Sequence, residues 1–143
     1  MDTTHGLQIG NLLLTDSNII VQVADIKEFR AMAKPLGKDK CHYNYHRREL
    51  HGLGLTQERL LWLGFVPWLE GEQRVLHLMG DISEDHSIEI DFEVWQSIDQ
   101  FTLCLRVKCE DVVTLTFIPR IRFVHEIQNL YLLLTGEQLE INL

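Results

Sequence analysis

The chain has few cysteines and no long hydrophobic run. Its three cysteines, Cys41, Cys104 and Cys109, are odd in number and lack a disulfide-like spacing, which favours a reducing compartment. The N-terminal residues are polar and lack the apolar core of a signal peptide, and no run approaches the roughly 18 apolar residues that span a bilayer. We therefore expect a cytoplasmic protein without a membrane partner.

Basic residues are also few relative to acidic ones. The 143 residues include 13 lysines and arginines against 21 aspartates and glutamates, which gives a net charge of −8. That charge argues against unspecific binding to nucleic acid. Hydrophobic residues make up 45% and charged residues 24%, as in ordinary globular proteins. We predict a single domain over 1–143 and leave open whether it forms a homo-oligomer.

Motifs for catalysis are missing as well. No GxSxG motif occurs, and neither Cys104 nor Cys109 lies near a histidine in sequence. Gly52 and Gly54 lack the preceding strand and the further glycine of a phosphate-binding loop. We expect no enzymatic activity and no cofactor.

Periodicity and turn residues predict an α+β fold. An N-terminal β-hairpin is expected within 7–25, because two β-prone runs, Leu12–Thr15 and Ile19–Val23, flank turn-forming residues. Thr56 is expected to cap one short central helix at Gln57–Leu63, which Gly64 ends. An antiparallel β-meander is then predicted from strands at 74–79, 87–95, 101–108 and 112–118.

The strongest helix signal lies near the C-terminus, from Val124 to Gly136. Apolar residues there share one helical face, and Gly136 can adopt the conformation that ends a helix. We expect this helix to cover the inner face of the meander, with a short edge strand after it at 139–143. The segment 25–36 also has helical spacing, although it could equally extend the first sheet.

Charged residues alternate with apolar ones in the predicted strand 87–95. Glu89, Asp91 and Glu93 are expected to point outward, where Arg106 and Lys108 of the next strand would meet them. We interpret these residues as exposed pairs that help to set the register of the two strands.

The segment from Gly37 to Gly54 shows no periodicity. We predict a long exposed loop there, within a variable region 34–54 that precedes a helix-sheet-helix body at 55–143. Residues 34–51 contain five basic and two acidic residues, together with tyrosines and histidines. Arginine binds phosphate and aromatic rings stack on bases, so an anionic, nucleotide-type ligand is predicted to contact Lys40, Tyr43, Tyr45, Arg47 and Arg48. A solvated loop is the simpler alternative.

A metal site in the same region is a weaker alternative. Cys41, His42, His46 and His51 are residue types that bind zinc, but their spacing matches no paired finger and no HExxH helix. We therefore expect no bound metal. If the three histidines did hold one, a small metal-assisted hydrolase would be the corresponding function.

Three stretches of the sequence resemble a group of small uncharacterised proteins that are common in Bacteroidetes genomes and in their phages and mobile elements. The stretches are IGNLLL at 9–14, LTQERLLWLGF at 55–65 and VHEIQNLYLLLTGEQL at 124–139. The resemblance implies a phage or mobile-element accessory protein that acts in the cytoplasm of a bacterial host cell. The basic region at 34–51 departs from the usual pattern of the group, so a special function is expected there.

These observations together predict a noncatalytic binding protein. Its expected task is to capture an anionic, nucleotide-type ligand or signal, in opposition to a host defence system. The alternative is a protein–protein interaction module that binds and inhibits a host protein, through the same loop or through residues next to the closing helix.

Overall fold

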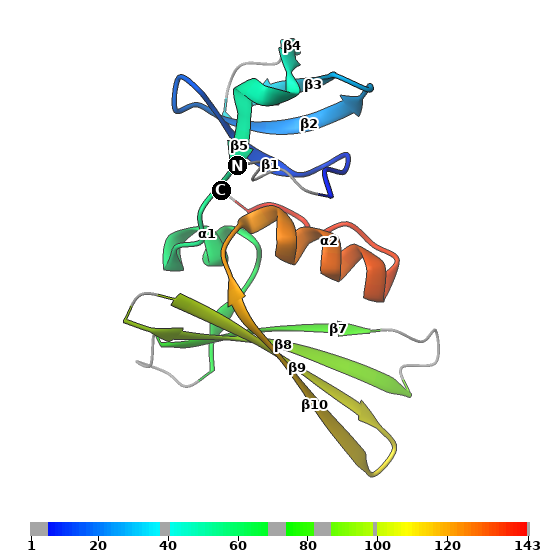
Figure 1. Ribbon diagram of the computed structural model, residues 1–143. Helices are drawn as coiled ribbons and strands as arrows, with labels where there is room; N and C mark the ends of the chain where they lie inside the picture. The colour runs from blue at the N-terminus through cyan, green and yellow to red at the C-terminus, as the bar shows by residue number, and fades with distance from the viewer. Residues whose placement is uncertain (1–5, 38–40, 69–73, 82–86, 99, 143) are drawn as a thin grey trace. The chain divides into compact units, whose positions relative to one another are not determined.

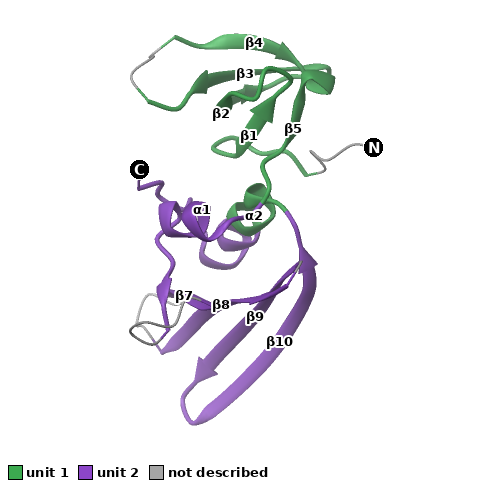
Figure 2. Cartoon of the chain, turned by 90° about the vertical axis from the view of Figure 1, so that its left-hand side faces the viewer, with its two compact units in different colours: residues 1–54, 123–129 green, residues 55–122, 130–143 purple. Residues whose placement is uncertain are grey.

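The computed structural model describes residues 6–37, 41–68, 74–81, 87–98 and 100–142 (Figure 1). The chain divides into two compact units, the first made of Met1–Gly54 and Phe123–Asn129 and the second of Leu55–Arg122 and Leu130–Leu143 (Figure 2). Each unit contains one five-stranded antiparallel sheet, so the predicted α+β class is confirmed. None of the helices in the described ranges has the length and apolar character needed to cross a bilayer.

The first unit contains five strands in the spatial order β4-β3-β2-β1-β5. The predicted hairpin is confirmed, since the first two strands pair across a turn in which Asn18 has a φ of 62°. The strands are β1 (Leu12–Thr15), β2 (Ile20–Ile26), β3 (Arg30–Pro35), β4 (Tyr43–His46) and β5 (Leu50–Gly52).

This first sheet curls into a small barrel. β4 ends at His46 and β5 begins at Leu50, although the two strands lie at opposite edges of the sheet. The edges of a flat five-stranded sheet would lie about 19 Å apart, whereas four steps of extended chain span at most about 14 Å. The sheet must therefore curve until the 3-10 turn η1 (Arg47–Glu49) can join its edges.

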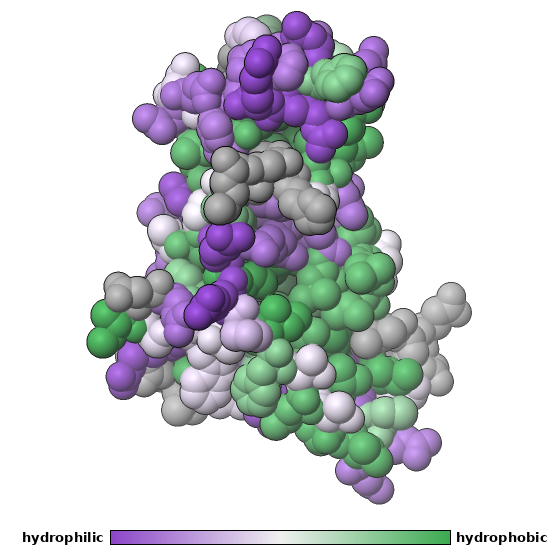
Figure 3. Space-filling model, viewed as in Figure 1, coloured by the Kyte–Doolittle hydropathy of each residue, from purple (hydrophilic) through white to green (hydrophobic). Residues whose placement is uncertain are grey.

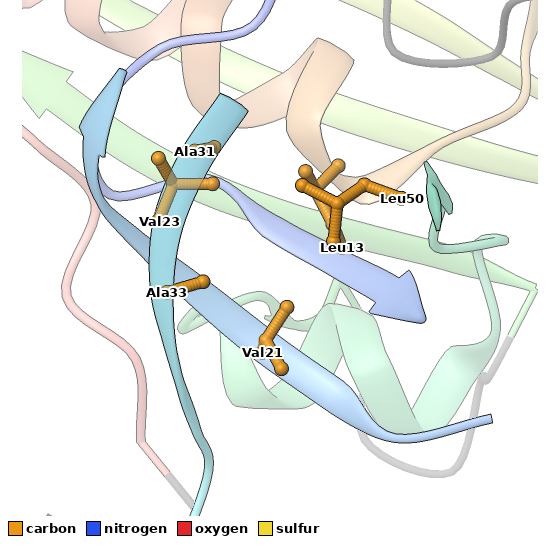
Figure 4. Close-up of a cluster of buried hydrophobic side chains, with 6 residues drawn as sticks. All are labelled: Leu13, Val21, Val23, Ala31, Ala33 and Leu50. Atoms are coloured by element: carbon orange, nitrogen blue, oxygen red, sulfur yellow. The ribbon is translucent and has the colours of Figure 1, made fainter. Parts of the chain in front are cut away.

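The interior of the barrel is filled by small and branched side chains from four strands. Figure 4 shows them gathered between β1, β2, β3 and β5. Because a narrow barrel leaves little room, two of the positions on β3 are alanines. The buried residues are Leu13, Val21, Val23, Ala31, Ala33 and Leu50.

Two sequence predictions in this unit were wrong. The segment 25–36 contains the end of β2 and strand β3 rather than a helix, because Ala31 and Ala33 are buried by pairing with β2. Tertiary pairing overrides helix propensity there, so the alternative of an extended sheet is the correct one. The long exposed loop at 37–54 is also wrong within the described residues 41–54, which form β4, η1 and β5. Tyrosines favour strands, and an edge strand tolerates charged neighbours.

Hydrogen bonds join two of the stretches on which the resemblance rests. The side chain of Gln128 accepts from Leu12 N at 2.9 Å and donates to Gly10 O at 3.0 Å. Asn11 Nδ2 donates to Asn129 Oδ1 at 2.8 Å. All of these residues belong to the first unit, so the segment 123–129 is an integral part of that unit.

The second unit is an antiparallel meander with helices on one face. Its sheet has the order β10-β9-β8-β7-β6, and Thr56 caps the short helix through a bond from Arg59 N to Thr56 Oγ1 of 3.1 Å. The predicted meander and central helix are thereby confirmed. The elements are α1 (Gln57–Trp62), β6 (Val66–Pro67), β7 (Val75–Asp81), β8 (Ile88–Ser97), β9 (Gln100–Cys109) and β10 (Val112–Ile121), together with the part of α2 (Val124–Thr135) that begins at Leu130.

The C-terminal part of α2 covers the inner face of this second sheet, as predicted. The Tyr131 ring lies 5.4 Å from the Phe92 ring, and a Cβ atom on Gly80 would lie 3.3 Å from Thr135. Gly136 ends the helix with a φ of 76°. The predicted edge strand is wrong for 139–142, where no strand forms and Asn142 N donates to Trp62 O instead. Leu143 lies outside the described residues.

Candidate functional site

The predicted ligand residues fall on β4 and η1, except Lys40, which lies outside the described residues. Tyr43 and Tyr45 stand opposite Ala33 and Ala31, so they share the inner face of the barrel sheet, with ring centroids 6.5 Å apart. Tyr45 packs against the buried cluster, whereas Tyr43 is exposed at its edge. The structure thus brings the two rings together and gives one of them a packing role.

The two arginines lie on the turn that follows. Arg47 Nη1 donates to Glu28 O at 3.4 Å, and Arg47 N donates to Phe29 O at 2.9 Å. Arg48 has an exposed side chain, and its backbone N–H donates to His46 Nδ1 at 3.3 Å. One arginine is therefore held against the barrel and the other is open to solvent.

The four residues of the metal alternative have separate environments. Cys41 and His42 are exposed. His46 caps η1, and His51 on β5 pairs with Asp16. In the part of the chain that the structure describes, no group of three or more His, Cys, Asp or Glu side chains could hold a metal ion.

A second candidate site, which the sequence analysis did not identify, lies on the second sheet. We use the term "outer face" for the side of β6 to β9 opposite α2. Strand register places its side chains in adjacent rows, with His77 opposite Glu93 and Asp91 opposite Arg106. The outer face comprises Val66, Trp68, His77, Met79, Asp91, Glu93, Trp95, Cys104 and Arg106.

Glu93 is a buried carboxylate in the middle of the outer face. It is 2% exposed, and its Oε1 accepts from Arg106 Nε at 3.1 Å while its Oε2 accepts from Trp95 Nε1 at 3.3 Å. The predicted meeting of acidic and basic residues across β8 and β9 is confirmed by the register. The expectation that Asp91 and Glu93 are exposed is wrong, because large neighbours on the same face exclude water from them.

Asp91 and His77 lie close together beside this first pair. His77 Nδ1 lies 3.4 Å from Asp91 Oδ1, and neither of these buried atoms has a hydrogen-bond partner among the described residues. Burial raises the pKa of Asp91 above its usual value, and this effect exceeds the opposing influence of His77. Burial also raises the pKa of the neighbouring Cys104 thiol, which disfavours the reactive thiolate.

Aromatic and other apolar side chains surround these charges and remain open to solvent. The Trp68 ring stands edge-on to His77 at 4.9 Å, and the Arg106 guanidinium lies over the same ring at 5.7 Å. Trp68, Met79 and Trp95 are 43%, 51% and 49% exposed. Figure 3 shows hydrophobic residues at the surface of the second unit, in the lower part of the view. The outer face therefore combines exposed apolar groups with a buried charged centre.

One feature of the sequence points to this face. Trp95 is two positions after Glu93, so it points to the same face of the strand as Glu89, Asp91 and Glu93. A large aromatic ring therefore follows three carboxylates on one face. A purely solvated row of charges would not need it. Trp68, by contrast, lies 27 positions earlier in the chain, and only strand pairing brings it to Arg106.

Comparison with models of protein families, with curated proteins and with solved structures finds no match to this chain.

Proposed function

We propose that this protein is a noncatalytic interaction module that binds another protein through the outer face of its second sheet. The observation that carries the proposal is the half-exposed set of Trp68, Met79 and Trp95 around Arg106. Protein interfaces are enriched in aromatic residues, methionine and arginine, and tryptophan and arginine are the commonest residues that dominate binding energy. An exposed apolar surface of this kind generally marks a binding site.

The charged centre of the outer face supports binding rather than catalysis. The two Glu93 oxygens are already occupied by Arg106 and Trp95, whereas His77 Nδ1 and Asp91 Oδ1 lie 3.4 Å apart without a hydrogen bond. Groups that satisfy one another are pre-organised, so a partner can cover them without leaving a charge unpaired. The raised pKa of the Cys104 thiol is the opposite of what a cysteine nucleophile requires.

The resemblance supports a biological setting for this proposal. A phage or mobile-element accessory protein would meet the proteins of its bacterial host in the cytoplasm. We infer that the partner is a host protein, and that binding would inhibit it as part of countering a host defence system.

A cross-linking experiment tests the proposal. A photoreactive phenylalanine analogue is placed at Met79 and, as the matched control, at Phe29, an exposed residue of the first unit. We expect a host protein to cross-link at position 79 and not at position 29. The same protein should then bind Trp68→Ala at least about thirtyfold more weakly than wild type, the loss typical of a dominant interface residue. Equal binding of wild type and Trp68→Ala by the identified partner would refute the outer face as the site.

The β4–η1 region supports a second candidate function, the binding of an anionic nucleotide-type ligand. The supporting observation is that the adjacent Tyr43 and Tyr45 rings come shortly before Arg47 and the exposed Arg48 in the chain. Calorimetric titration with nucleotides and cyclic dinucleotides tests it. We expect Arg48→Ala to weaken any binding about tenfold, as for loss of a charge-assisted hydrogen bond, and the charge-matched control Lys27→Ala to leave it unchanged. Absence of heat with every anion would remove this candidate.

A further inference from the structure

Strand β10 forms an exposed edge of the second sheet. It is the last strand in the sheet order, and it extends over ten residues from Val112 to Ile121. Both of its faces are open between Val112 and Phe117, where the side chains of Val113, Leu115 and Phe117 are 49%, 48% and 62% exposed. Figure 1 shows the β9–β10 hairpin running out beyond the helices of its unit. Large apolar side chains are therefore presented on a strand that no described strand covers.

The turn of this hairpin determines which backbone groups of β10 are open. Cys109 pairs with Val112 across the two-residue turn Glu110–Asp111. In such a hairpin the flanking pair exchanges both hydrogen bonds, and the bonded and non-bonded pairs then alternate along the strands. The N–H and C=O groups of Val113, Leu115 and Phe117 consequently point away from β9, toward the open edge.

This edge lacks the features that normally prevent strands from pairing. Residues 112–118 include no charged residue and no proline, and Pro119 and Arg120, where the register shifts, come only after them. The opposite edge of the same sheet differs, because β6 is two residues long and contains Pro67. A long apolar edge without such protection is a template for a further strand.

We propose that β10 pairs with β10 of a second copy of this chain, antiparallel and about a two-fold axis at Leu115. The sequence from Val113 to Phe117 is Val-Thr-Leu-Thr-Phe, which reads as apolar, Thr, Leu, Thr, apolar in either direction. Such self-complementarity is what a two-fold interface requires. Leu115 would face the partner's Leu115, and Val113 would face the partner's Phe117, with both backbone hydrogen bonds formed in each pair.

Charge complementarity supports the same antiparallel pairing. A two-fold axis at Leu115 brings the turn that carries Glu110 and Asp111 to the end of the partner's strand that carries Arg120. Each end of the paired strands would then combine an acidic turn with a basic residue, and no like charges would face each other. The pairing goes beyond the proposed function, since it needs no other protein.

Charge reversal at the axis tests the pairing. The wild-type protein should have twice the 16.7 kDa mass of the chain by light scattering and sedimentation. Leu115→Lys and Leu115→Glu should each halve that mass, because equal charges would meet on the axis, and mixing the two variants should restore the dimer. Leu133→Lys, at an exposed position on α2, should remain dimeric. Circular dichroism checks that each variant is folded.

A disulfide experiment tests the register independently of these variants. Facing residues in a hydrogen-bonded pair have Cα atoms about 5.5 Å apart, which suits a disulfide. With the exposed Cys41 and Cys109 replaced by serine, Leu115→Cys treated with diamide should give a covalent dimer, whereas Leu133→Cys should not. A wild-type protein that stays monomeric from micromolar to millimolar concentration would overturn the proposal. So would a dimer that neither charge reversal disrupts, or one that Leu115→Cys does not cross-link.

Discussion

Gly52 shows how a single missing atom allows the first unit to pack. A Cβ atom at this position would lie 2.6 Å from Cδ1 of the Phe123 ring and within 2.9 Å of two other ring atoms. Phe123 in turn stacks on His125, which is buried, so the ring has little freedom to move. Gly52 is therefore required by close approach and not by its backbone conformation.

We expect Gly52→Ala to lower the free energy of unfolding by about 1–3 kcal/mol, the usual cost of overpacking. Urea unfolding followed by circular dichroism measures it. Gly54→Ala is the matched control, since a Cβ atom there would meet nothing within 4 Å, and it should change stability by less than about 0.5 kcal/mol. Equal effects of the two substitutions would show that the Phe123 contact is not the cause.

Asp91 makes the stability of the second unit depend on pH. Burial is the largest cause of its raised pKa, with Glu93 adding to it and His77 and Arg106 opposing it. Above its ordinary value of 3.8 the folded state therefore binds more protons at this carboxyl than the unfolded state does. Stability contributed by Asp91 is consequently lost as pH rises from 3.8 through the raised pKa.

We expect Asp91→Asn to remove this pH dependence. The difference in free energy of unfolding, variant minus wild type, should increase as pH rises from 3.8 toward neutrality. Urea titrations of both proteins at several pH values between these limits provide the measurement. A flat or falling difference would contradict the assignment.

At the scale of elements, α1 depends on its cap and on its packing. A helix of six residues is too short to be stable by itself, so its ends and its buried side chains must hold it. Leu60 is fully buried, and Thr56 Oγ1 accepts a hydrogen bond from Arg59 N.

We expect Thr56→Ala to reduce the free energy of unfolding by about 1 kcal/mol through loss of the cap. Thr56→Ser keeps the hydroxyl and should restore most of the stability. Thermal and urea unfolding of the three proteins give the comparison. If serine were as harmful as alanine, the methyl group of Thr56 and not its hydrogen bond would be responsible.

Strands β3 and β4 show the limit of local signals at this scale. Alanine, methionine and lysine in β3 favour helix, but Ala31 and Ala33 fit a barrel interior that larger side chains would overfill. The tyrosines of β4 alternate with Asn44 and His46, although charged residues around them hide the period of two. Both strands exist because a neighbouring strand accepts their hydrogen bonds.

At the scale of the whole molecule, the first unit is discontinuous in sequence. It needs residues 123–129 in addition to 1–54. The Gln128 side chain accepts a hydrogen bond from Leu12 N and donates one to Gly10 O. The Asn129 side chain accepts a hydrogen bond from Asn11 and donates one to Gly6 O. Without that segment these polar groups lose their partners, which is costly for those that are buried.

We expect the fragment 1–54 to unfold less cooperatively and at lower urea concentration than a chain that joins 1–54 to 121–137 through a flexible glycine-serine linker. Amide exchange should be faster at Leu12 in the short fragment, because its N–H loses the Gln128 acceptor. Equal stability of the two fragments would show that 123–129 is dispensable for the first unit.

The sequence by itself determined the elements with local signals. Turn formers specified the first hairpin, a capping threonine began α1, alternation specified β8 and β9, and a glycine ended α2. Each signal acts between residues that are close in the chain, so it can be recognised from the residue types and their spacing.

Only the tertiary structure decided the remaining features. It made 30–35 and 43–46 into strands, buried Asp91 and Glu93, and assembled Trp68, Met79 and Trp95 into one face. These outcomes depend on which strands pair and in which register. A register shift of one residue would move every side chain of a strand to the other face, and only long-range pairing fixes that choice.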